Sequence, residues 1–240
     1  MDVGIYHIYY IVFIASAFVL GAIPFGIIWA WLFALGDVRK IGSGNIGATN
    51  VLRTGNKLAA FLTLTGDLGK GFIATLLPLF FIPMHGVHDI SAIEINIANL
   101  SGIAGVAGVA VVVGHCYSPL VGFKGGKGVA TGIGVVLGFV PIVNLVIDTE
   151  VSLATLDIFA IAGWVPLTVL LVAWFAIAII TRYSSLAAIV SFATMPVMVW
   201  LVAGDTNLPL ASFAISAIII WRHRANITRL LKGDEAKIGG

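Results

Sequence analysis

Seven long apolar runs account for most of this 240-residue chain and limit what it can fold into. Hydrophobic residues make up 60% of the sequence and charged residues only 10%, whereas a soluble domain carries about 25% charged residues. In lipid, an α-helix satisfies its own backbone hydrogen bonds. We therefore predict an all-α polytopic integral membrane protein, a single transmembrane domain over residues 1–240. About seven transmembrane helices are expected near 5–34, 58–82, 97–117, 129–147, 160–181, 186–203 and 207–221. Pro24 is expected to kink the first run.

The basic residues are sorted to one side of these runs. Twelve of the thirteen lie in four segments, near 35–57, 118–128, 182–185 and 222–240, and the thirteenth is Lys70 inside an apolar run. Segments on the opposite side contain no Lys or Arg. The positive-inside rule therefore predicts that the N-terminus is outside, and that the C-terminus and the four basic segments are cytoplasmic.

The first basic segment contains GSGNIGATN, which matches the dinucleotide fingerprint G-x-G-x-x-G at Gly42, Gly44 and Gly47. That fingerprint must follow a buried strand in a βαβ unit, but the preceding apolar run is far too long for a strand. A dinucleotide site is therefore not expected. Glycine amides can instead turn toward an anion, and Arg53 can hold a phosphate through two parallel hydrogen bonds. Ser43, Asn45 and Asn50 are the polar residues of this loop.

The second segment, GHCYSPLVGFKGGKGVATG, is similar to a nucleotide P-loop but departs from it at two positions. Val121 stands where the first glycine is required, and Gly128 replaces the Ser or Thr that follows the lysine. What remains is a glycine loop with two cations, Lys124 and Lys127, before a helix. We interpret it as an anion cradle.

The last two segments add further polar side chains on the same side. Arg182 and Ser185 lie in a short turn that by itself would read as an ordinary interfacial turn. His223, Asn226 and Arg229 recur at helical spacing, and an interfacial amphipathic helix is the default interpretation of that pattern. Together, the four segments offer groups that suit a small phosphorylated ligand.

Other chemistries find less support in the sequence. No metal-ligand cluster and no nucleophile with a partnered base is recognised, and a single cysteine, Cys116, excludes an internal disulfide. An anion transporter and a non-catalytic lipid-phosphate-binding protein remain alternatives, although transport should place polar groups on both faces. Asp67 and Lys70, spaced i and i+3 in an apolar run, are expected to form a structural intramembrane pair.

Five stretches together resemble the bacterial acyl-phosphate:glycerol-3-phosphate acyltransferase family. They are GSGNIGATNVLR, DLGKG, GH..SP...FKGGKGVAT, RYSSLA and RHRANITRLL.G.E.K, and they run from residue 42 to residue 237. The resemblance implies seven membrane helices in the bacterial inner membrane and an active site that faces the cytoplasm. It also implies transfer of a fatty acyl group from acyl phosphate to glycerol 3-phosphate, giving lysophosphatidic acid for phospholipid synthesis. Outer stretches 83–96 and 148–159 look longer than in compact family members.

The resemblance also assigns site residues. A glycerol 3-phosphate pocket that carries the reaction is implied at Ser43, Arg53, Lys127, Ser185, His223 and Asn226. Further contacts to substrate are expected from Gly44, Asn45, Gly47, Asn50, His115, Lys124, Gly125, Gly126 and Arg182. No cofactor, metal or nucleic acid is expected. The expected partners are the two substrates and membrane lipids, and an enzyme that produces acyl phosphate is a conceivable further one.

Two further expectations concern the chemistry. The His-x-x-x-x-Asp motif of acyltransferases with soluble domains is absent, because the fifth residue after each of the five histidines is never Asp. An acyl phosphate is already an activated mixed anhydride, so direct transfer without an acyl-enzyme is expected. Glycine-loop amides could stabilise the oxyanion, and a substrate phosphate oxygen could accept the hydroxyl proton.

Overall fold

The computed structural model describes residues 3–82, 90–150, 162–204 and 206–238 as a bundle of long helices, and no strand occurs in these ranges. The long helices are α1 (Val3–Ala22), α4 (Lys57–Leu76), α5 (Ile90–Cys116), α6 (Val129–Glu150), α8 (Val165–Thr181), α9 (Ser184–Ala203) and α10 (Leu208–Arg222). Shorter helices are α2 (Phe25–Leu32), α3 (Ala48–Leu52) and α11 (Arg224–Lys232), and 3₁₀ turns cover Val38–Lys40, Leu77–Phe80 and Pro119–Val121. The predicted all-α class is therefore confirmed for the described residues.

Each predicted apolar run contains a helix, but not all of these helices are equally long. Four helical segments are long and apolar enough to cross a membrane: Gly4–Leu32, Lys57–Phe80, Ile95–Val121 and Ser184–Ala203. Within the described residues, Val129–Leu145, Val165–Thr181 and Leu208–Arg222 are apolar but shorter. The expected number of seven crossings and their orientation thus stay predictions. The outer stretches 83–89 and 151–159 lie outside the described residues.

The predicted kink at Pro24 is a break between two helices. Pro24 has no N–H, so the Leu20 carbonyl four residues earlier loses its helical donor and accepts instead from the Ile23 amide at 3.3 Å. The Ile23 carbonyl accepts from the Phe25 amide at 3.2 Å and from the ammonium of Lys70 on α4 at 2.9 Å, so a side chain from a neighbouring helix also binds the break. Helix α2 then leaves α1 and leads into the first basic segment.

Glycines let two pairs of helices approach closely. A Cβ atom on Gly114 of α5 would lie 2.3 Å from the Phe18 carbonyl oxygen of α1, and a Cβ on Gly134 of α6 would lie 2.0 Å from the Leu68 carbonyl oxygen of α4. Small residues at such crossings increase van der Waals contact, which is the main source of helix association in membranes. The α1–α5 and α4–α6 pairs are therefore fixed at backbone contact distance.

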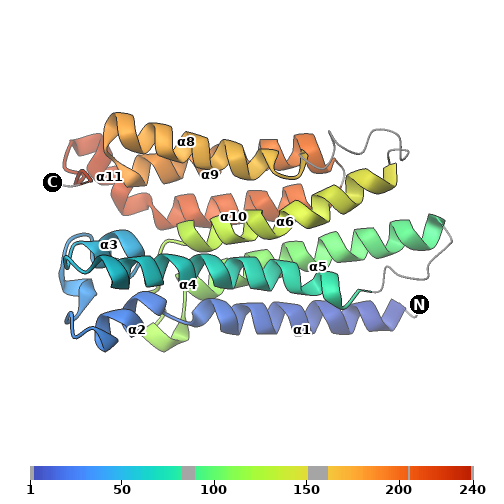
Figure 1. The fold of residues 1–240 in the computed structure, drawn as a ribbon, viewed down its shortest axis with the longest axis horizontal. Helices are drawn as coiled ribbons and strands as arrows, with labels where there is room; N and C mark the ends of the chain where they lie inside the picture. Colours follow the sequence, from blue (N-terminus) through green and yellow to red (C-terminus); the bar gives the residue numbers. More distant parts are fainter. Residues whose placement is uncertain (1–2, 83–89, 151–161, 205, 239–240) are drawn as a thin grey trace.

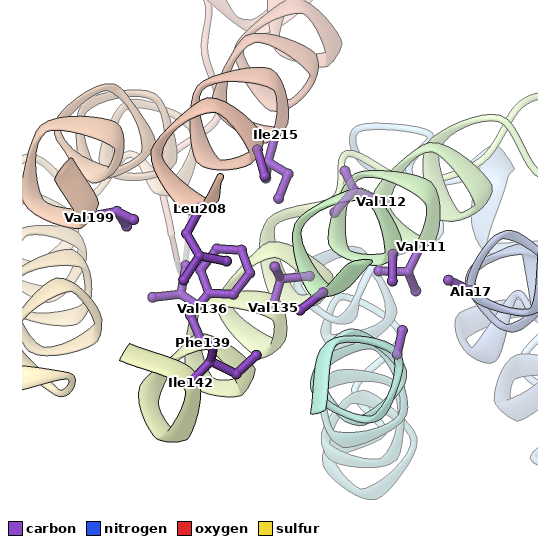
Figure 2. Close-up of a cluster of buried hydrophobic side chains, with 14 of the residues drawn as sticks. Ala17, Val111, Val112, Val135, Val136, Phe139, Ile142, Val199, Leu208 and Ile215 are labelled. Atoms are coloured by element: carbon purple, nitrogen blue, oxygen red, sulfur yellow. The ribbon is translucent and has the colours of Figure 1, made fainter. Parts of the chain in front are cut away.

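The apolar core lies where α5, α6, α9 and α10 meet. Figure 2 shows Phe139 and Ile142 of α6 gathered with Leu208 and Ile215 of α10, while Val111 and Val112 of α5 extend the cluster toward α1. Large apolar side chains elsewhere are exposed, including Ile11, Phe175, Ile180 and Phe213. An outward apolar belt of this kind suits contact with lipid chains.

The basic segments gather at one end of the bundle. In Figure 1, α3 and α11 lie at the left end with the C-terminus, and the start of α1 lies at the right end. The turn between α8 and α9 is also at the left end. The first and last described residues thus lie at opposite ends, as an odd number of crossings requires.

Candidate active site

Asn50 organises the first glycine loop from inside. Its buried side chain accepts a hydrogen bond from the Ser43 amide at 3.0 Å, and its Nδ2 donates to the carbonyls of Val38 and Asn45, each at 2.7 Å. Asn50 was expected to contact substrate, but its polar side-chain atoms already form hydrogen bonds within the loop. Asn50 instead shapes the loop that presents Ser43, which is exposed.

Gly42 brings Arg53 onto the same loop. Its φ of +52° lies in the left-handed region, and a Cβ there would lie 2.4 Å from Arg53 Nη1. Gly44 is also left-handed, with φ +66°, while Gly47 has ordinary extended geometry and precedes α3. The Arg53 guanidinium therefore lies directly against the loop that carries Ser43, and the glycine makes room for it.

Lys127 of the second loop lies in a strongly cationic environment. It is half-buried, and desolvation is the main reason why its pKa falls from 10.5 to about 8. Glu235 opposes that fall, whereas the charges of Arg229, Arg222 and Arg53 add to it. Electrostatic contact with all four groups places Lys127 where the first, second and fourth basic segments meet. An anion bound there would replace repulsion between cations by attraction.

His223 stands at the junction of α10 and α11. It is 2% exposed, and burial is the main cause that lowers its pKa to about 4. The ring is therefore neutral near pH 7. Its Nδ1 lies 2.7 Å from the Ile219 carbonyl oxygen, which can only accept, so Nδ1 carries the proton and Nε2 is left as an acceptor. A neutral acceptor of this kind suits a substrate hydroxyl.

Glu235 joins the third and fourth segments. One carboxylate oxygen accepts hydrogen bonds from Ser185 Oγ at 2.7 Å and Asn226 Nδ2 at 2.6 Å, and the other accepts from Arg229 Nε at 2.7 Å. Burial alone would raise the pKa of Glu235, but these three bonds outweigh it and hold the pKa below its usual value. Ser185 and Asn226, both expected in the phosphate pocket, are thus arranged around an anionic oxygen.

Arg182 and Lys124 do not take part in the contacts around Lys127 and Glu235 described above. The Arg182 guanidinium donates to the Ile238 carbonyl at 2.8 Å, and the Arg182 carbonyl accepts from the Ile238 amide at 2.7 Å. Its bonds therefore fasten the C-terminal tail, which differs from the expected contact to substrate. Lys124 is exposed on the second loop.

His115 also differs from the expected substrate contact, because it is buried within the membrane-spanning part of α5. Its Nδ1 lies 3.4 Å from Asp67 Oδ1, and the same oxygen lies 2.8 Å from Lys70 Nζ. Asp67 and Lys70 thus form the ion pair that their spacing suggests, with His115 as a third member. All three side chains are at most 6% exposed.

Two contributors to the site have no role assigned from the sequence. Arg222 donates to the carbonyls of Gly125 and Gly126, at 2.8 and 3.1 Å, and its guanidinium lies 5.1 Å from the ring centroid of Tyr117. Glu235 is the other. Both residues belong to the quoted motif RHRANITRLL.G.E.K, but the motif does not indicate what their side chains contact.

The arrangement offers anion binding and hydrogen bonding. Among the residues that the structure describes, no group of three or more His, Cys, Asp or Glu could hold a metal ion. Cys116 is a free, fully buried thiol. Cations at Arg53 and Lys127 can hold a phosphate, and the neutral His223 can accept a hydrogen bond from an alcohol.

Comparison with known proteins places this site in a family. The family model described as glycerol-3-phosphate acyltransferase matches residues 11–233. A glycerol-3-phosphate acyltransferase of Methylobacillus flagellatus is 39% identical over 95% of this chain and 96% of its own, and that of Sinorhizobium medicae is 44% identical over 92% and 89%.

Solved structures agree with the sequence matches. Crystal structures of PlsY, an integral membrane glycerol 3-phosphate acyltransferase, superpose with a TM-score of 0.74 in the glycerol 3-phosphate form and 0.71 in the lysophosphatidic acid form. Sequence identity to them is 33% and 32%, and each alignment covers 96% of this chain and at least 95% of the other. The resemblance of the five motifs is confirmed, and the chain belongs to the glycerol-3-phosphate acyltransferase (PlsY) family.

Proposed function

We propose that this protein transfers a fatty acyl group from acyl phosphate to the 1-hydroxyl of glycerol 3-phosphate, releasing lysophosphatidic acid and inorganic phosphate. Family membership and the solved PlsY complexes support the acceptor and the product. The observation that carries the proposal is the placement of Lys127 within the fields of Arg53, Arg222 and Arg229. Such a cluster suits two phosphate-bearing substrates held together.

Roles for the individual groups follow from this placement. Arg53 and Lys127 bind the phosphate of glycerol 3-phosphate, and Ser43 supplies a hydrogen bond. Ser185 and Asn226, which donate to Glu235 in the free enzyme, supply further ones by exchanging that carboxylate for the phosphate. Holding the hydroxyl at the carbonyl carbon converts a bimolecular step into a local one, which can lower the barrier by about 7–11 kcal/mol. Glycine-loop amides other than those of Gly44 and Gly126, which donate to backbone carbonyls, stabilise the oxyanion, and one such donor is worth roughly 3–4 kcal/mol.

The hydroxyl proton has two acceptors within the site. The pKa of His223 is about 4, so its Nε2 is a weak base and serves to orient the hydroxyl. A phosphate monoester has a second pKa of about 6 and is the stronger base. We therefore assign the final proton to a substrate phosphate oxygen, with His223 holding the hydroxyl in place.

The donor is tested with purified protein in detergent and labelled glycerol 3-phosphate. Fatty acyl phosphate should give labelled lysophosphatidic acid, and acyl-CoA of the same chain length should give none. Equal rates from the two donors would refute the choice of donor and leave the acyltransferase assignment standing. No transfer from either donor would refute the function.

The reaction is expected to proceed by direct transfer. A covalent intermediate needs a nucleophile with an activating base. Ser43 Oγ faces the side-chain oxygen of Asn50 at 3.4 Å, and the carboxylate partner of Ser185 is a weak base because its pKa is lowered. Initial-rate plots should therefore intersect, and Cys116→Ala should retain most activity. Parallel plots, or an acyl group trapped on a serine or on Cys116, would contradict direct transfer.

The site is proposed to face the cytoplasm from the bacterial inner membrane. The one-sided distribution of basic residues motivates this orientation. Single cysteines are introduced at positions 2, 89 and 237 in a Cys116→Ala background. An impermeant thiol reagent added to intact cells should label positions 2 and 89 and spare position 237. Labelling at position 237 would contradict the proposed orientation.

Activity should fall at alkaline pH as Lys127 loses its proton. Its pKa of about 8 in the free enzyme means that the charged form predominates at pH 7 and is the minority form at pH 9. Because kcat/KM reports ionisation in the free enzyme, it should decrease about tenfold between these values. Glycerol 3-phosphate remains a dianion throughout, since its second pKa is about 6. Lys127→Arg, which stays charged, should flatten the profile, and an unchanged alkaline limb would exclude Lys127 as its origin.

A further inference from the structure

The two glycines before Lys127 are held by contacts on two sides. The amide of Gly126 donates to the His115 carbonyl at 3.1 Å, while Arg222 binds the carbonyls of both glycines. A Cβ on Gly125 would lie 2.0 Å from the His115 carbonyl oxygen, and a Cβ on Gly126 would lie 2.1 Å from His115 Nε2. Neither glycine has a positive φ. Space beside His115, and not backbone conformation, therefore requires glycine at both positions.

This packing indicates a different role for the two glycines of GGK than the anion cradle expected from the sequence. An anion cradle needs free amides, but the Gly126 amide already binds the end of α5. The glycines lie against α5, at a distance that any side chain would prevent. The next residue is Lys127, so the position of the backbone at Gly126 also sets the position of the ammonium group that follows.

His115 is itself fixed from inside the bundle. Its ring is 6% exposed and faces Asp67 of α4, which is paired with Lys70. Lys70 in turn donates to the Ile23 carbonyl at the break before α2. The ring cannot retreat from Gly126 without disturbing contacts that join α4, α5 and the α1–α2 break. A flexible exposed side chain could move aside for a larger residue at position 126, whereas the packed His115 ring cannot.

We propose that His115 is a positioning residue of the acyltransferase, a rigid seat beneath Gly126 that sets where Lys127 meets the phosphate of glycerol 3-phosphate. This inference rests on the proposed function. Displacement by about 1 Å in a positioned group can reduce a rate about a hundredfold. His115 therefore acts through the loop, without contact to substrate, and the buried Asp67–Lys70 pair acts by holding the ring.

A double-mutant cycle between positions 115 and 126 tests the seat. His115→Asn keeps a polar group facing Asp67 and removes the ring atoms that a Cβ at 126 would meet. In the natural background, Gly126→Ala should lower kcat/KM for glycerol 3-phosphate by about tenfold or more, mainly through KM. In the His115→Asn background, the same methyl should cost less than about threefold. Gly69→Ala, whose Cβ has no neighbour within 4 Å, is the matched control.

Three readouts separate the possible outcomes. The thermal midpoint should show the same non-additivity, and this arm tests the contact even if the protein catalyses no acyl transfer. The alkaline limb of kcat/KM should move upward in Gly126→Ala, because a displaced Lys127 is less desolvated. Equilibrium binding of labelled glycerol 3-phosphate repeats the cycle without turnover. Equal losses from the methyl in both backgrounds would overturn the proposal, as would non-additive stability with additive kcat/KM and binding.

Discussion

Replacing Lys127 by alanine is expected to reduce kcat/KM for glycerol 3-phosphate by roughly a hundredfold while the protein still inserts and folds. Loss of one partner from a buried charge contact costs about 2–5 kcal/mol, and about 3 kcal/mol corresponds to that factor. Lys127 is half-buried among cations, so truncation removes the charge that a bound phosphate uses and relieves repulsion in the empty site. Stability should therefore change little or rise slightly.

Arg53→Ala is expected to have a comparable effect on kcat/KM, through the first glycine loop. The guanidinium is exposed and lies against Gly42, so its removal should alter the free energy of unfolding by less than about 0.5 kcal/mol. Arg53→Lys should recover only part of the loss, since an ammonium cannot make two parallel bonds to phosphate.

Steady-state kinetics with purified variants, over a range of glycerol 3-phosphate concentrations, decides both cases. Lys232→Ala is the matched control, because Lys232 is an exposed cation on α11 at the same end of the bundle. It should remain within about twofold of the natural protein. Near-natural kcat/KM in Lys127→Ala or Arg53→Ala would remove that residue from the site, whereas an equal loss in Lys232→Ala would point to a general surface charge effect.

Local patterns in the sequence predicted the helices well. Apolar runs of membrane-spanning length and a proline inside the first run are local signals, and they predicted seven helical stretches and the break at Pro24. The positions of the basic residues predicted which loops lie at the same end of the bundle. These properties depend on neighbours in the chain and on the solvent, so they can be recognised without knowledge of tertiary contacts.

Contacts between distant residues could not be predicted in this way. Glu235 reaches Ser185 across 50 positions because the tail folds back onto Arg182. His115 meets Asp67 because α4 and α5 bring them together, and Asn50 turns its side chain into its own loop. Asn50 and His115 carry polar side chains that would suit substrate binding equally well, and both were expected to contact substrate. Only tertiary packing shows that the polar atoms of Asn50 lie within its own loop and that His115 faces Asp67.

The second large effect concerns the stability of the bundle. Breaking the intramembrane pair with Lys70→Met should lower the free energy of unfolding by about 3–5 kcal/mol, because it leaves the Asp67 carboxylate buried with only His115 opposite it. It also removes the ammonium donor to the Ile23 carbonyl, which then keeps only the bond from the Phe25 amide at 3.2 Å. Asp67→Asn should destabilise as well, since it leaves a buried ammonium that still caps Ile23 but has no counter-ion.

The double variant Asp67→Asn/Lys70→Met separates charge from packing. It leaves no buried charge from the pair, so its loss of stability should be clearly smaller than the sum of the two single losses. It should still be less stable than the natural protein, because the Ile23 carbonyl at the α1–α2 break loses its hydrogen bond from Lys70. The stabilities of the natural protein, the two single variants and the double variant are compared by thermal unfolding in the same detergent. A loss of about 3 kcal/mol corresponds to a fall in Tm of roughly 6–12 °C in a chain of this size. Additive losses would mean that the two side chains stabilise the bundle independently and that the 2.8 Å contact contributes little. A strongly non-additive result would show that the membrane interior tolerates these charges only as a pair.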